Sequence, residues 1–154
     1  MGYGVYAPEL HYDDYGNTAV KGCIVVYLDQ APAIFPSNER AYFSSAATKY
    51  TEAVKRGAVG VISLSTGGSL AGWDAMVKRA YQGTYRWAET NGQLQPDFPE
   101  LKVIAALNPA RADMLFAGSA HSWQDVLAAA KAGQPQSFPL GKKAAMEVST
   151  TRRA

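Results

Sequence analysis

The sequence predicts an α/β domain built on parallel strands. Residues 23–28 and 59–64 form two short, nearly continuous apolar runs, which are typical of strands buried on both faces. The residues between them have the amphipathic pattern of a helix. The order strand, helix, strand with short connections is that of a βαβ unit, so we expect the two strands to be parallel.

The helix between these strands has recognisable ends. Ser44 or Ser45 is suited to cap its first turn, Lys55 and Arg56 lie near its last turn, and Gly57 follows. Serine favours helix N-termini, whereas basic residues and then glycine favour C-termini. The expected buried stripe of this helix consists of Ala46, Tyr50, Ala53 and Val54.

The regions on either side of this unit predict further elements. Residues 3–7 have the composition of a short strand, and residues 13–17 supply the polar and glycine residues of a turn. The apolar spacing of residues 70–80 predicts a helix. Its expected buried side chains are Trp73, Met76, Val77 and Ala80.

A third strand and a further helix are expected after the middle of the chain. Residues 101–107 are apolar and short enough for a strand. Asn108 can cap a helix whose first position is Pro109, and Gly118 marks its end.

The C-terminal part predicts one more helix and one more strand. Ser122 and Asp125 have the spacing of a capping box, opening a helix that runs to about Lys131 and stops at Gly133. Residues 144–152 alternate apolar and polar side chains, as strands with one buried face do.

Length and composition indicate one domain and exclude some partners. A chain of 154 residues with 47% hydrophobic residues is large enough for a single buried core. Lys and Arg total 15 against 13 Asp and Glu, and a net charge of +2 is too small to indicate a nucleic acid or an anionic membrane as partner. No stretch approaches the roughly 20 apolar residues of a transmembrane helix.

Cys23 is the single cysteine of the chain. An internal disulfide and a multi-cysteine metal site are therefore excluded. Because Cys23 stands in an apolar run, we expect it to be a small, buried strand residue that reacts slowly with thiol reagents.

The triplet His11-Tyr12-Asp13 has the His-x-Asp form with which di-zinc peptidases hold a metal and its bridging carboxylate. Each zinc needs about three or four protein ligands, and the chain offers only one other histidine, His121. We therefore interpret His11 as a turn residue, and Asp13 and Asp14 as acceptors of backbone N–H groups in the following loop.

Other catalytic motifs are also incomplete. No serine lies in a Gly-x-Ser-x-Gly sequence, as a nucleophile elbow requires. The stretch Gly67-Gly68-Ser69 lacks the lysine and the glycine spacing of a phosphate-binding loop. The residues for catalysis are not assembled, and we expect the chain by itself not to be an enzyme.

Several stretches resemble the protease-associated (PA) domain that is inserted in zinc aminopeptidases of the co-catalytic di-zinc family. The resemblance begins with GYGVYAPE at residues 2–9 and YDDY at residues 12–15, and it continues through residues 20–26, 49–62 and 115–118. It covers most of the chain. One departure is Cys23, which stands where the family commonly has lysine.

The resemblance implies a fold and a function beyond what the residues themselves establish. The chain would be one PA-type insertion domain over residues 1–154, a fragment of a larger peptidase. Its fold would be of the swivelling β/β/α type, a mixed β-sheet or sandwich covered by helices. Its role would be non-catalytic: to modulate substrate access or recognition and to mediate protein interaction.

The resemblance also implies partners and a location. The partners would be the peptidase domain of the same parent chain and its peptide substrate. Zinc would be held only by that peptidase domain, so no cofactor is expected here. The parent enzyme would be exported and would be periplasmic or extracellular.

The segment between residues 67 and 99 offers a candidate binding surface. It is long for a connection, and long connections inside compact domains are usually functional or disordered. It contains aromatic and arginine side chains, the types that dominate interfaces when they are exposed. The candidate residues are Tyr81, Tyr85, Arg86 and Trp87.

Two alternatives to the PA-type function stay open. The aromatic segment from Trp73 to Trp87 is compatible with an independent domain that binds a small molecule or a peptide. The acidic turn with His11, Asp13 and Asp14 is the basis for a metal-dependent hydrolase, for which the ligand count is unfavourable.

Overall fold

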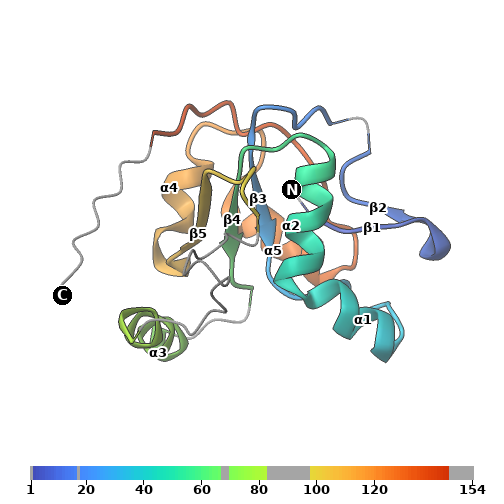
Figure 1. Ribbon diagram of the computed structural model, residues 1–154, viewed down its shortest axis with the longest axis horizontal. Coiled ribbons are helices and arrows are strands. Elements are labelled where there is room, and N and C mark those ends of the chain that lie inside the picture. The colour runs from blue at the N-terminus through green and yellow to red at the C-terminus, as the bar shows by residue number, and fades with distance from the viewer. Residues whose placement is uncertain (1, 17, 67–69, 83–97, 146–154) are drawn as a thin grey trace, which may run out of the picture.

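Three parallel strands form the central sheet of the domain (Figure 1). They are β3 (Ile24–Leu28), β4 (Gly60–Leu64) and β5 (Val103–Leu107), in that spatial order. The predicted α/β class and the parallel pairing of β3 with β4 are confirmed. The computed structural model describes four segments of the chain: residues 2–16, 18–66, 70–82 and 98–145.

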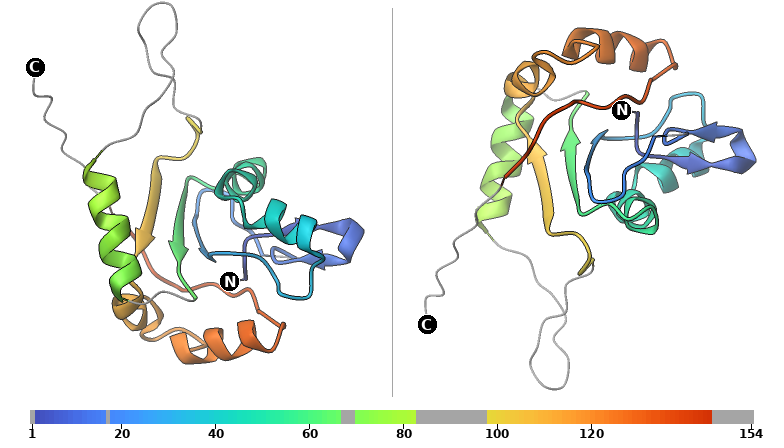
Figure 2. Two further views of the ribbon diagram at one scale, coloured as in Figure 1. Left: turned by 90° about the horizontal axis from the view of Figure 1, so that it is seen from below. Right: turned by 90° about the horizontal axis from the view of Figure 1, so that it is seen from above.

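Helices cover both faces of this sheet (Figure 2). On one face, α2 (Ala46–Lys55) packs over a core that contains Tyr27, Ala53, Ala58, Val61 and Leu101. On the other face lie α4 (Ala112–Phe116) and α5 (Trp123–Lys131). That core includes Val26, Leu28, Leu64, Phe116, Trp123 and Val126. Successive strand residues point to opposite faces, which explains why β3 and β4 are apolar almost throughout.

A small antiparallel hairpin lies beyond the β3 edge of the sheet, on the side away from β5 (Figure 2). Its strands are β1 (Tyr6–Ala7) and β2 (Tyr12–Asp13), joined by a 3-10 turn, η1 (Pro8–Leu10). The predicted strand over residues 3–7 therefore forms only at its end. The preceding residues run beside β3 instead, where the N–H of Leu28 donates to the carbonyl of Gly2 at 3.0 Å.

The region between β3 and β4 contains two helices where one was predicted. The unpredicted helix is α1 (Ser37–Ser44), and α2 follows it directly. Ser45 separates them with an extended backbone, but its side chain makes no capping hydrogen bond. Of the expected buried stripe, Ala53 is buried and Ala46 is exposed. The stripe was wrong at Ala46 because the first turn of α2 lies outside the core.

The predicted helix boundaries after β5 are largely confirmed. The side chain of Asn108 accepts a hydrogen bond from the N–H of Ala110, but the turn that follows is the 3-10 segment η2 (Pro109–Arg111), and α4 begins after it. Ser122 and Asp125 form the predicted capping box of α5. Of the expected strand over residues 144–152, residues 144 and 145 are not in a strand, and the rest lie outside the described residues.

Helix α3 (Leu70–Tyr81) forms where the sequence predicts a helix, but its expected core face is not buried. Met76 is 41% exposed and Ala80 is also exposed, while Trp73 and Val77 are half-buried. The prediction that these four side chains share a core was wrong. Helix α3 contacts η2 rather than covering a face of the sheet, so fewer neighbours are available to exclude water.

Cys23 is exposed, which contradicts the prediction that it is buried. Strand β3 begins one residue later, at Ile24. Cys23 instead closes a tight turn, in which its N–H donates to the carbonyl of Val20 at 2.9 Å. The apolar run that predicted the strand thus begins at Cys23, one residue before the strand itself, and this first residue is not covered by other elements.

The capping box of α5 generates a stability prediction. Ser122→Ala should lower the free energy of unfolding by about 1 kcal/mol, because the N–H of Asp125 loses its acceptor. Ser122→Thr, which keeps a capping hydroxyl, serves as the matched control. Urea unfolding of the two variants would contradict the assignment if both had the same midpoint.

Candidate functional site

A buried ammonium group links three separate segments of the chain. Lys49, on α2, is only 2% exposed. Its Nζ donates hydrogen bonds to the backbone carbonyls of Tyr3 at 2.6 Å, of Leu28 at 3.1 Å and of Gln30. An ammonium group has three N–H donors. All three are therefore used inside the domain.

Aromatic rings and carboxylates complete the surroundings of Lys49. Its Nζ lies 5.0 Å from the ring centroid of Tyr27 and 5.8 Å from that of Tyr3, within the range of cation–π attraction. Burial lowers the pKa of Lys49 to about 8, and the negative charges of Asp14 and Asp29 oppose this effect. At pH 7 the side chain is thus still protonated, which suits its three carbonyl partners. Lys49 is a structural cation rather than a general base.

The carboxylate of Asp14 is the second buried polar group beside the N-terminal segment. Its Oδ2 accepts from the N–H of Val5 at 3.0 Å, and its Oδ1 accepts from the hydroxyl of Tyr12 at 2.8 Å. Burial raises the pKa of Asp14, although these hydrogen bonds and Lys49 act in the opposite direction. A Cβ atom at Gly2 would lie 1.6 Å from Oδ1 of Asp14, so this close approach requires glycine.

Arg56 joins the end of α2 to the hairpin. Its guanidinium carbon lies 4.9 Å from the ring centroid of Tyr6 and 4.4 Å from that of Tyr15. Its Nε donates to Glu52 at 2.8 Å, and Nη2 lies 3.9 Å from Asp13. A guanidinium group is suited to stacking and to ion pairing at the same time. The residues around Arg56 thus stabilise the position of the hairpin.

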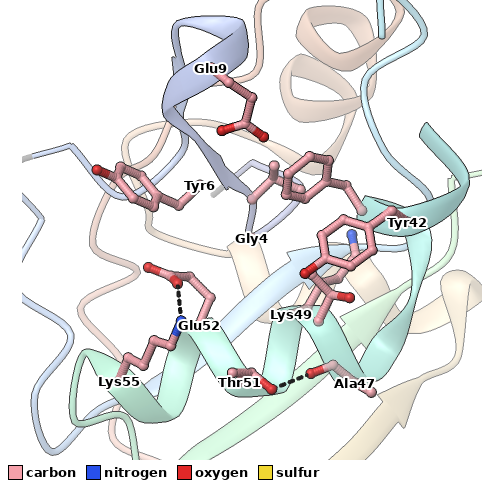
Figure 3. A pocket seen from close by; sticks show the side chains of 12 residues that line it. Gly4, Tyr6, Glu9, Tyr42, Ala47, Lys49, Thr51, Glu52 and Lys55 are labelled. Carbon is pink, nitrogen blue, oxygen red and sulfur yellow. Dashed lines mark hydrogen bonds and ion pairs between the residues drawn. The ribbon is translucent and has the colours of Figure 1, made fainter. Parts of the chain in front are cut away.

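A cleft of about 380 Å³ lies between the hairpin and the helices α1 and α2 (Figure 3). Figure 3 shows Glu9 on the hairpin side and Tyr42 on the α1 side of this hairpin cleft. On the α2 side, Lys55 and Glu52 form an ion pair at 3.9 Å, and Lys49 also contributes to the lining. The lining carries charges of both signs, so it selects no one class of charged ligand.

A larger cleft of about 700 Å³ runs along β3 and beneath residues 137–144, and we call it the β3 cleft. Its volume lies within the range of about 300–1,000 Å³ that is common for ligand sites. The larger apolar side chains that line it are Val20, Ile24, Val25, Val26, Val59, Ile62, Leu115, Phe138 and Leu140. The β3 cleft is the more suitable of the two for an apolar ligand.

The structure does not bring the suspected zinc ligands together as a metal site. His11 is exposed at the end of η1 with a φ of 53°, as a turn residue. Oδ1 of Asp13 accepts from the N–H of Tyr15 at 2.8 Å, whereas Asp14 accepts from Val5. The interpretation as backbone acceptors is confirmed, although the partner of Asp14 lies before it in the chain. Among the described residues, no three His, Cys, Asp or Glu side chains are grouped so as to hold a metal ion.

The candidate aromatic surface is described only at its first residue. Tyr81, at the end of α3, is 88% exposed. Tyr85, Arg86 and Trp87 lie outside the described residues. Their role in binding stays a prediction.

Sequence reasoning missed the burial of Lys49. A signal was present, because position 49 lies three residues after Ala46 and four before Ala53, on the predicted buried stripe. A lysine at such a position requires acceptors from other segments. The sequence pattern of the helix contains no information about which carbonyls they are.

A comparison of the chain with models of known protein families, with curated proteins and with solved structures finds no match. In the part of the chain that the structure describes, no helix has both the length and the apolar character needed to span a membrane.

The hydrogen bonds of Lys49 predict a large loss of stability when it is replaced. Lys49→Met should lower the free energy of unfolding by about 3 kcal/mol or more, because buried carbonyls lose their donor at about 1–3 kcal/mol each. Lys55→Met, on the exposed side of the same helix, should change it by less than about 0.5 kcal/mol. Equal urea midpoints for the two variants would contradict the assignment.

Buried tyrosines predict how stability changes in alkaline solution. Burial raises the pKa of Tyr3, Tyr12, Tyr15 and Tyr27 above the ordinary value of 10. The stabilisation from these groups is complete below pH 10 and is lost as the pH rises further, because only the unfolded chain then ionises readily. These four of the nine tyrosines should ionise in one step with the loss of circular dichroism. Smooth ionisation of all nine while the dichroism is unchanged would contradict this prediction.

Proposed function

We propose that this chain is a non-catalytic, PA-type domain of a zinc aminopeptidase, which modulates access or recognition of peptide substrates. One observation carries the proposal: residues from the two stretches that open the resemblance, 2–9 and 12–15, meet in one buried network. Gly2 leaves room for the carboxylate of Asp14, and the carbonyl of Tyr3 accepts from Lys49.

Contacts in and beside this network give residues of these two stretches a structural reason. Gly4 has a φ of +69°, which favours glycine, and a Cβ atom there would lie 3.1 Å from Cβ of Tyr27. Asp13 and Asp14 accept hydrogen bonds from backbone N–H groups. These residues depend on one another across the fold, which supports a shared scaffold as the origin of the resemblance. A short motif that matched by chance would not need such contacts.

The same contacts support a non-catalytic role. The two buried ionisable groups in and beside these stretches make internal hydrogen bonds: Lys49 to three carbonyls, and Asp14 to Val5 and Tyr12. A general acid, a general base or a metal ligand needs an available proton or lone pair at the substrate. The hydrolase built on His11, Asp13 and Asp14 thus has little support.

The remaining parts of the proposal follow from membership of such an enzyme. The swivelling β/β/α fold, the peptidase domain of the same parent chain as partner, zinc confined to that domain and export of the parent are all proposed together. A second candidate, an independent domain that binds a peptide or a small molecule, is favoured by the volume and apolar lining of the β3 cleft.

The reading frame around this chain tests the proposal. We expect it to continue on both sides and to encode, downstream, a His-x-Asp sequence with the further histidine and carboxylate ligands of two zinc ions. The parent protein should bind zinc and cleave aminoacyl substrates, and this chain alone should do neither. Stop codons directly on both sides, or a zinc-dependent activity of this chain alone, would contradict the proposal and favour one of the two alternatives.

A further inference from the structure

The β3 cleft lies along an open edge of the parallel sheet. Strand β4 pairs with one edge of β3, and no described strand pairs with the other. The carbonyl of Cys23 accepts from Val59, and the N–H of Asp29 donates to Leu64, so alternate residues from Cys23 to Asp29 face β4. The residues between them present their N–H and C=O groups outward.

Three residues of β3 face this outer edge. One of them, Leu28, already donates its N–H to the carbonyl of Gly2. The other two, Ile24 and Val26, have no outward backbone partner among the residues that the structure describes. Both also line the β3 cleft. An extended peptide that enters the cleft therefore meets the outward N–H and C=O groups of these two residues, as in strand addition.

The opposite wall of the cleft is an extended segment of the chain itself. Residues 137–144 contain no helix or strand, and the right-hand view of Figure 2 shows this part of the chain running across the strands after α5. Phe138 and Leu140 give this wall its apolar side chains. Ser137 holds its beginning in place by donating a hydrogen bond to the carbonyl of Asp14. The cleft is thus bounded by a strand edge and a second apolar segment.

Positive charge is concentrated where this wall ends. Lys142 and Lys143 line the cleft and are exposed, and neither has an ion-pair or hydrogen-bond partner within the described segments. Asp14, the one carboxylate of the lining, is buried and bonded to Val5 and Tyr12. The available charge at the cleft is therefore positive and suits a carboxylate.

We propose that the β3 cleft binds the C-terminal end of an extended, apolar peptide. The peptide adds to the free edge of β3 through Ile24 and Val26, its side chains occupy the apolar cleft, and its terminal carboxylate contacts Lys142 and Lys143. The inference rests on the proposed function for its biological meaning, since an aminopeptidase acts on the amino end of a peptide. A site that holds the carboxyl end leaves the amino end free to reach the zinc ions.

Binding of a synthetic peptide to the purified chain tests this inference. The probe is a pentapeptide of alternating valine and threonine with a free C-terminal carboxylate, and the matched control is the same peptide with a C-terminal amide. Titration calorimetry should show binding that is weakened about tenfold by amidation, because a hydrogen bond to a charged group is lost. The double variant Lys142→Gln/Lys143→Gln should lose a similar factor. The double variant Lys102→Gln/Lys131→Gln, with exposed lysines that do not line the cleft, should bind as the unmodified chain does.

The single cysteine reports whether the peptide occupies the proposed site. Cys23 is exposed and lines the β3 cleft, so bound peptide should slow its alkylation. This measurement needs no substitution in the protein. Absence of binding, equal affinity for the amide, or unchanged alkylation at saturation would each overturn the inference. Preferential binding of octanoate over the peptide would also overturn it, in favour of a small-molecule site.

The peptide-binding experiment and the sequence of the surrounding reading frame test the two proposals separately. If the peptide binds but no zinc ligands are encoded beside this chain, the proposed function fails and the cleft assignment stands. If zinc ligands are encoded and the peptide does not bind, the cleft assignment fails alone.

Discussion

The fold depends on a single charged group that three distant segments share. Lys49 on α2 donates to carbonyls that lie 46, 21 and 19 residues earlier in the chain, and so joins the N-terminal segment, the end of β3 and the turn after it. Removing an ammonium group from water is costly, and only matched acceptors make its burial tolerable. The three carbonyls provide that match. They also fix residues 2–5 beside the sheet, which the short hairpin by itself would not do.

The same arrangement positions both clefts. Gly4 lines the two of them, Lys49 lines the hairpin cleft, and Gly2 and Asp14 line the β3 cleft. The buried network around residues 2–5 is therefore the common wall between them. The shape of both clefts therefore depends on hydrogen bonds within the core.

Local chemistry was sufficient to predict much of the fold. The parallel pairing of β3 with β4 followed from two apolar runs joined by a short helical segment. The capping box at Ser122 and Asp125 fixed the start of α5, because both hydrogen bonds are made within one turn. The role of Asp13 as a backbone acceptor was likewise a local matter, since its partner is two residues away. In the last two cases the interacting groups are close in sequence, and in the first the short connection between the strands limits how they can pair.

The sequence by itself thus determined the class of fold, most helix and strand positions and the turn chemistry of the acidic segment. Only the tertiary structure decided that Lys49 is buried, that Cys23 is exposed and that α3 keeps Met76 in contact with solvent. The β3 cleft is also a tertiary feature, because its walls come from segments more than 100 residues apart. A pattern of apolar residues indicates which face of an element is suited to burial. Whether that face is covered, and with which acceptors a buried charge is matched, depends on segments that the local pattern does not contain.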